Sequence, residues 1–225
     1  MRIRVAFSKT EAMRYTGHLD LHRAWERTFR RAGLPLAYSQ GFHPQPKLNL
    51  ACALPLGFTS ECELLDAWLD APLPDSTIQD ALAGALPPGI RIHSLEEIDP
   101  KAPALQTQVQ SVVYWVTLLD PLPDLEARLA RILSAVALPR QRRGKSYDLR
   151  PLIDAIQRLP DATDGLPRLE MRLAARESAT GRPEEVLAEI GVGIEAARVH
   201  RVKLHYQEIG PNREAIDPMY QESAP

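Results

Sequence analysis

The chain has 225 residues, of which 44% are hydrophobic, 25% charged and 6% aromatic; this composition is typical of a folded globular protein and excludes a disordered or collagen-like chain. Two cysteines, Cys52 and Cys62, do not suggest a secreted disulfide framework, and no Cys/His spacing indicates a zinc site. No stretch approaches the roughly 18 apolar residues of a membrane span, and no signal peptide is evident, so we expect a cytoplasmic protein that does not cross a membrane.

Charge is distributed unevenly along the chain, although the net charge is only −2. Residues 1–47 carry 9 basic and 3 acidic residues, residues 48–139 carry 4 and 12, and residues 140–225 carry 14 of each. A basic N-terminal zone is compatible with an anionic partner, because the local field steers association. Solvated helix faces also collect charge, so this asymmetry alone does not assign a function.

The first 98 residues predict the element order β-α-β-β-α-β. Alternation at Ile3, Val5 and Phe7 predicts a half-buried strand. Apolar residues then recur at helical spacing from about 17 to 32, where Gly33 and Pro35 end the predicted helix. The other predicted elements are strands at about 48–54 and 64–69, which form a hairpin, a helix at about 75–86, and a strand at about 90–98.

A second, less regular unit is predicted after a proline-containing linker at 99–108. It covers 109–209, and 210–225 form a C-terminal tail. Its predicted elements are strands at about 112–119, 169–175 and 199–207 and helices at about 123–136 and 183–190, whereas residues 147–159 suit either a strand or a helix. We therefore predict an α+β protein of tandem ferredoxin-like (β-α-β-β-α-β) units with antiparallel sheets.

Histidines near the first predicted helix form one candidate site. His18 and His22 lie four residues apart, which places two imidazoles on adjacent turns, with Asp20 between them and His43 in the following loop. These residue types suit metal binding or acid/base catalysis. A histidine beside an apolar helix face is more often structural, and Asp20 suits the first turn of a helix. We therefore assign no metal and no cofactor, and an enzyme with this site is the alternative hypothesis.

Two loops have the composition of nucleic-acid contacts. Residues 140–150, RQRRGKSYDLR, combine five basic residues with Tyr147. Residues 40–47 contain Phe42, His43 and Lys47, which are types that stack on bases, donate hydrogen bonds and meet phosphates. Pro44 and Pro46 stiffen this loop, which suits a preorganised site and a rigid hairpin entry equally well.

The two last predicted strands add a basic sheet face. Arg168, Arg172 and Arg176 alternate along one strand, and Arg201, Lys203 and His205 along the other, so we expect them to form one surface beside the strand between them. Tyr114 and Trp115 lie on opposite faces of that middle strand, so only one of them can stack on a base there. The predicted RNA contacts are Lys47, Arg140, Arg142, Arg143, Lys145, Arg150, Arg168, Arg172, Arg201 and Lys203.

Several short motifs resemble one bacterial family. They are His18-Leu19-Asp20, Arg30-Arg31-Ala32-Gly33-Leu34-Pro35, Gln40-Gly41-Phe42-His43-Pro44 with Pro46-Lys47, Leu54-Pro55-Leu56-Gly57, residues 60–63 with Asp66, Arg142-Arg143 with Lys145, Asp148-Leu149-Arg150 and residues 181–187. Together they resemble the radical-SAM-linked conserved domain of unknown function, which occurs alone or joined to a radical SAM protein. The resemblance spans nearly the whole chain and implies a radical SAM protein as partner.

The chain itself lacks the Cx3Cx2C cluster that radical SAM chemistry needs, so the resemblance implies an accessory part. We predict a non-catalytic module that binds RNA or presents a substrate. A third possibility is a pure protein-interaction domain that uses its acidic zone, residues 61–80, as a docking face.

Overall fold

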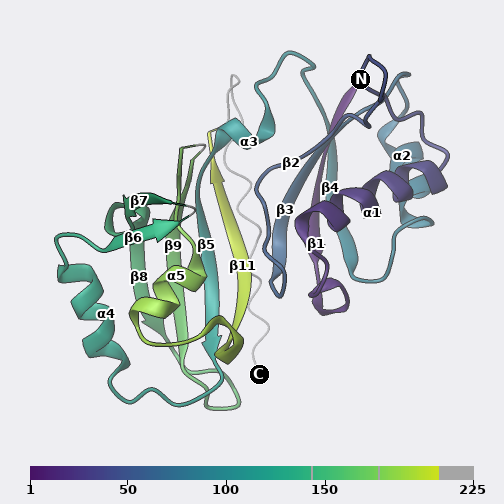
Figure 1. Cartoon of the computed structure of the whole chain (residues 1–225). Coiled ribbons are helices and arrows are strands. Elements are labelled where there is room, and N and C mark those ends of the chain that lie inside the picture. The colour runs from purple at the N-terminus through teal and green to yellow at the C-terminus, as the bar shows by residue number, and fades with distance from the viewer. Residues whose placement is uncertain (143, 177, 208–225) are drawn as a thin grey trace.

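The computed structural model describes residues 1–142, 144–176 and 178–207 (Figure 1). Arg143 and the tail predicted at 210–225 lie outside the described residues. Within the described ranges, no helix is both long and apolar enough to cross a membrane.

The first half of the chain follows the predicted element order. Its apolar alternation and helical spacing give the expected elements, and the strands β2 and β3 pair in antiparallel fashion as predicted. The bounds are β1 Arg2–Lys9, the short 3-10 helix η1 Glu11–Met13, α1 His18–Arg31, β2 Leu48–Leu50, β3 Thr59–Trp68, α2 Asp75–Ala83 and β4 Ile90–Ile98.

The second half begins with a short helix inside the segment predicted as a linker. Residues 147–159, left open between helix and strand, contain the end of one strand and all of another. The bounds are α3 Leu105–Gln108, β5 Val109–Leu118, α4 Leu125–Ser134, β6 Pro139–Arg142, β7 Lys145–Asp148, the 3-10 helix η2 Arg150–Leu152, β8 Ile153–Leu159, β9 Arg168–Arg176, β10 Ala179–Thr180, α5 Pro183–Glu189, the 3-10 helix η3 Ile194–Ala196 and β11 Ala197–Tyr206.

One continuous sheet contains the main strands of both halves in the order β10-β9-β5-β11-β3-β1-β4, with β2 and β8 added on β3 and β9. All its neighbours are antiparallel except β11 and β3, which run parallel through the pairs His200↔Thr59 and Arg201↔Ser60. We call this β11–β3 junction the seam. The strands β6 and β7 form a separate two-stranded hairpin.

The predicted α+β class and the mostly antiparallel sheet are confirmed. With β6, β7 and β10 left out, four strands of each half lie in the same relative order, as β2-β3-β1-β4 and β8-β9-β5-β11. The assignment of each half to the ferredoxin-like family, and the division of the chain at 99–108, stay predictions.

Helices cover one face of the sheet in each half (Figure 1). In the first half, Leu21, Trp25 and Phe29 of α1 pack in the core with Val5 and Phe7 of β1. This spacing of three to four residues is what the helical period requires of a buried stripe. In the second half, α4 and α5 bury Leu129, Ile132, Val186 and Leu187 in the core that contains the inward residues of β5, β9 and β11.

The opposite face of β9, β5 and β11 carries the side chains that this core leaves out. Because neighbouring strands are in register, these side chains form three rows across the sheet. The rows are Arg198, Thr117 and Arg168; His200, Trp115 and Glu170; and Lys203, Val113 and Arg172. We call these nine residues the polar face.

Candidate nucleic-acid interface

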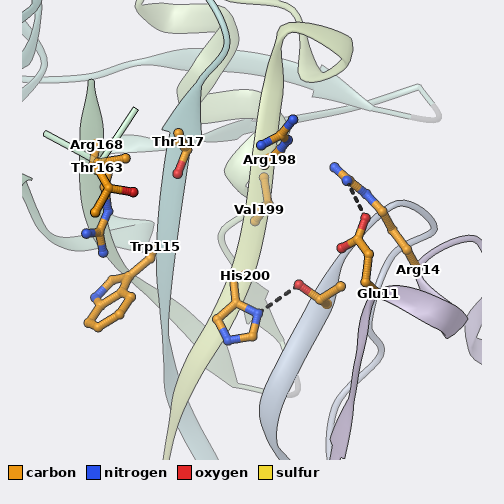
Figure 2. A pocket seen from close by; sticks show the side chains of 11 residues that line it. Glu11, Arg14, Trp115, Thr117, Thr163, Arg168, Arg198, Val199 and His200 are labelled. Carbon is orange, nitrogen blue, oxygen red and sulfur yellow. Dashed lines mark hydrogen bonds and ion pairs between the residues drawn. The ribbon is translucent and has the colours of Figure 1, made fainter. Parts of the chain in front are cut away.

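Trp115 is the aromatic side chain of the polar face (Figure 2), and two residues of β9, Arg168 and Glu170, contact its ring. Its indole Nε1 donates to Glu170 Oε2 at 3.1 Å. The guanidinium carbon of Arg168 lies 4.9 Å from the ring centroid, which is within cation–π distance. Tyr114 lies on the other face and is buried in the core. The structure thus confirms that only one of these two aromatics faces the polar surface.

A pocket of about 370 Å³ opens beside Trp115, at the seam. Arg198, His200 and Thr117 line it from the polar face, together with Trp115 and Arg168. Glu11, Arg14 and Thr59 come from the first half, and residues 162–163 come from the loop after β8 (Figure 2). Both halves of the chain therefore build this pocket.

Hydrogen bonds hold two of the pocket's polar side chains in place. The Nδ1 of His200 lies 2.7 Å from Thr59 Oγ1, and its Nε2 lies 3.5 Å from Glu61 Oε2. Arg14 donates from Nε to the Gly57 carbonyl at 3.0 Å and from Nη1 to Glu11 Oε1 at 2.8 Å. Side chains that are already positioned lose less conformational entropy when they bind a ligand.

The third row extends the positive charge along the polar face. Arg172 is exposed; its Nε donates to Ser111 Oγ at 3.0 Å and lies 3.7 Å from Asp154 Oδ2. Burial and then the neighbouring charges of Arg172 and Lys203 lower the pKa of His205 below its ordinary value. This shift favours the neutral form of His205, so Lys203 and Arg172 supply the positive charge here, with Asp154 beside Arg172 opposing it.

Arg201 does not belong to the basic surface on which it was predicted. The pairing register shifts between Arg201 and Lys203, so a bulge puts these two side chains on opposite faces although they are two residues apart. Arg201 is fully buried in the core side of the seam, where its Nη1 donates to Glu63 Oε1 at 2.8 Å. Its Nη2 also donates to Tyr114 Oη at 3.1 Å. A polyanion on the polar face cannot reach it.

The predicted basic segment 140–150 lies elsewhere, on the helical side of the second half. Arg140 of β6 forms an ion pair with Glu189 of α5, so its charge is already compensated. Arg150 donates to the carbonyls of Leu133 and Ile153, each at 3.1 Å. Lys145 is exposed and Arg142 half-buried in the hairpin, while Arg143 lies outside the described residues. The predicted RNA contacts are thus divided between two sides of the molecule.

The loop before β2 contains the remaining predicted contact. Lys47 and His43 are exposed there, and neither lines the pocket. His22 of α1 contacts the start of β2, with its Nε2 3.2 Å from the Leu48 carbonyl oxygen.

The structure does not bring His18, Asp20, His22 and His43 together as a group of metal ligands. Among the described residues, no three or more His, Cys, Asp or Glu side chains are placed to hold a metal ion. Asp20 is exposed and lies 3.4 Å from Arg23. Burial, followed by the nearby charge of His22, lowers the pKa of His18. His18 and His22 are both half-buried on α1, and the Nδ1 of His18 is buried without a hydrogen-bond partner among the described residues. An acid/base role for them stays a prediction.

The acidic zone 61–80 is not a uniformly exposed docking face. Glu63 is buried against Arg201, and Asp66 is fully buried between two arginines of β1. Asp66 accepts hydrogen bonds from Arg4 Nε at 2.7 Å and from Arg2 Nη2 at 2.6 Å. These two carboxylates stabilise the interior, because buried charges require partners.

Sequence reasoning singled out only Trp115 and Arg168 among the pocket residues, and it missed Arg14, Thr59, Arg198 and His200 among others. Arg198 and His200 alternate with the apolar Val199, which signals that these two share one face of the last strand. Uninterrupted alternation places that face opposite Lys203, and only the register shift between Arg201 and Lys203 brings all three together. Arg14 and Thr59 carry no such signal, because only the parallel pairing at the seam brings them near β11.

The chain belongs to the family described as "Uncharacterized protein conserved in bacteria (DUF2344)", which matches residues 2–183. No curated protein matches it. Among solved structures, it is similar over 90% of its length to 48% of a chain in a Cbf5-Nop10-Gar1 complex, with 10% identity and a TM-score of 0.46. It is also similar over 90% of its length to 47% of a chain in the archaeal box H/ACA sRNP Nop10-Cbf5 complex, with 10% identity and a TM-score of 0.44. The chain thus spans about half the length of these matched chains.

Proposed function

We propose that this protein binds single-stranded RNA on its polar face and presents it to a partner enzyme. The observation that carries the proposal is the position of Trp115, which lies between two rows that carry basic side chains. The proposed partner is a radical SAM protein, and this part rests only on the sequence motifs that resemble the radical-SAM-linked domain.

The residue types of the polar face match the two interactions that single strands require. Bases stack on aromatic rings, and each stacked base contributes about 1–3 kcal/mol. Arg198 and Arg168 flank Trp115 on one side, and Lys203 and Arg172 flank it on the other. Same-face neighbours along a strand lie about 7 Å apart, so the cations stand within one nucleotide's reach of the stacked base.

A single strand suits this arrangement better than a duplex. The bases of a duplex are stacked on one another, and the deep groove of an RNA helix does not admit side chains. Trp115 lines a concave pocket, so only an unpaired base can reach its ring. We therefore expect the protein to prefer loops, bulges or ends over continuous double strands.

The test is equilibrium binding of unpaired and duplex RNA over a salt series, with Trp115→Ala and an exposed control, Arg27→Ala on α1. We expect binding that weakens as salt rises, since cations release condensed counterions. Trp115→Ala should weaken binding about 5- to 160-fold, which is the range that loss of one stacked base predicts. Arg27→Ala should bind like the natural protein.

The hairpin provides a second arm of the same experiment. Because the hairpin lies on the helical side, reversing the charge at Arg142, Arg143 and Lys145 should weaken binding only of RNAs long enough to reach both sides. For these RNAs the salt dependence should flatten by about 0.7 in slope for each phosphate that the variant no longer neutralises. An absence of RNA binding at low salt, or a Trp115→Ala variant that binds as tightly as the natural protein, would refute the proposal.

A further inference from the structure

The pocket at the seam has more positive charge than an internal RNA linkage requires. Three arginines, Arg14, Arg168 and Arg198, line it with one carboxylate, Glu11, so these four side chains together carry two positive charges. An internal phosphodiester carries one negative charge, whereas a terminal phosphomonoester carries about −1.5 to −2 at pH 7. The charge of the pocket therefore matches a phosphate at the end of a chain.

Its size points to one nucleotide. Ligand pockets range from about 300 to 1,000 Å³, and the volume of about 370 Å³ is near the lower limit. Trp115 lies at one side and Arg198 and Arg14 toward another in Figure 2, so a base and its phosphate have separate partners. We propose that this pocket binds a single unpaired nucleotide that carries a terminal phosphomonoester. This inference rests on the proposed function and specifies which part of an RNA the polar face receives.

Two of the three arginines have guanidinium nitrogens that no described residue engages in a hydrogen bond. Arg14 uses Nε and Nη1 to contact Gly57 and Glu11, and its Nη2 has no hydrogen-bond acceptor among the described residues. Arg198 is exposed, and Arg168 has its guanidinium over the indole ring. Guanidinium groups bind phosphate oxygens in pairs, and charge-assisted bonds of this kind are about twice as strong as neutral ones.

The first half of the chain contributes directly to this recognition. Arg14 follows η1, and its backbone carbonyl accepts a hydrogen bond from the buried Lys9 ammonium at 3.2 Å. Lys9 also donates to the Phe58 carbonyl at 2.8 Å, next to the Gly57 carbonyl that fixes Arg14. The phosphate-binding arginine is thus anchored in the first half, while the stacking ring belongs to the second.

The experiment compares ten-nucleotide single-stranded RNAs that differ only at their ends: a 5′-phosphate, a 3′-phosphate, or hydroxyls at both ends. Adenosine 5′-monophosphate, adenosine 3′-monophosphate and adenosine serve as minimal probes. Quenching of Trp115 fluorescence reports binding, and Trp115→Phe removes the signal while it retains the two other tryptophans, Trp25 and Trp68.

We expect either the RNA with a 5′-phosphate or the RNA with a 3′-phosphate to bind at least tenfold more tightly than the RNA with hydroxyl ends. Arg198→Gln should abolish this difference, and Arg27→Gln should retain it. Arg14→Gln should act like Arg198→Gln, but it also removes the bond to Gly57, so the exposed Arg198 is the decisive position.

The outcomes separate this inference from the proposed function. If all three RNAs bind with equal affinity, the terminal-phosphate inference is wrong and RNA binding stands. If monophosphates bind in a phosphate-dependent way but no RNA binds, the pocket receives a free nucleotide and the RNA-binding proposal is wrong. If neither class binds, both are overturned.

Discussion

At the scale of single residues, the buried ion pair between Arg201 and Glu63 makes a testable contribution to stability. Both side chains are essentially inaccessible to solvent. Arg201→Met leaves the Glu63 carboxylate buried without its partner, and such a change costs about 3–5 kcal/mol. Denaturant unfolding should show this decrease. Replacing both residues with Met should restore most of it, because the uncompensated charge is then absent; a double variant no more stable than Arg201→Met would contradict this explanation.

Lys9 predicts a pH dependence of stability. Burial lowers the pKa of Lys9 to about 8 from its ordinary 10.5, although the charge of Glu63 opposes this shift and that of Arg201 adds to it. Between these two values the unfolded chain binds more protons than the folded one, so this group raises the free energy of unfolding as pH rises.

From the linkage relation, the contribution of Lys9 to the free energy of unfolding should rise by about 1 kcal/mol between pH 8 and pH 9. The measurement is the difference in unfolding free energy between the natural protein and Lys9→Met at each pH, which cancels the titration of Cys62 and other shared groups. A difference that stays constant or falls over this interval would show that Lys9 keeps an ordinary pKa.

At the scale of elements, local periodicity predicted most strands and helices. A single bulge in the last strand made it predict the wrong sheet face for one site residue. Alternation correctly marked the last strand and placed Lys203 on the polar face with Arg172. It failed for Arg201, because alternation assumes an uninterrupted ladder and the register shift between Arg201 and Lys203 breaks it. An inserted residue leaves no mark on composition, and so the buried arginine was assigned to the surface.

The hairpin of β6 and β7 shows a second limit of prediction from sequence, which concerns distant contacts. Five basic residues in 140–150 predict a nucleic-acid contact, but the sequence does not indicate the side of the sheet on which they lie, and of those described only Lys145 is exposed. That side is set by contacts with α5, such as the pair Arg140–Glu189, whose members are 49 residues apart. The pocket depends still more on distant contacts, since Thr59 and His200 are 141 residues apart.

At the scale of the whole molecule, the seam joins the halves through a core as well as through strands. Leu54, Phe58 and Leu64 of the first half belong to the hydrophobic cluster of the second half. The ring of Phe58 lies 6.2 Å from that of Tyr114 in an edge arrangement. Two units that share buried apolar surface stabilise each other, because separating them exposes that surface to water.

We therefore predict that the described chain unfolds in one cooperative transition. In Trp115→Phe, both remaining tryptophans, Trp25 and Trp68, report on the first half, and far-ultraviolet circular dichroism reports on both halves. The two signals should give the same midpoint. Ile156→Ala creates a cavity in the core of the second half. It should decrease the free energy of unfolding that the first-half fluorescence reports by about 2–5 kcal/mol.

Ile78→Ala, its counterpart in the first half's core, should shift both signals by a similar amount. Two separate midpoints, or an Ile156→Ala variant that leaves the tryptophan transition unchanged, would show that the halves are independent domains. Because Arg14 and Trp115 lie in different halves, independent unfolding would also mean that the pocket can be lost while both halves remain folded. Coincident midpoints would mean instead that the pocket persists until the whole sheet unfolds.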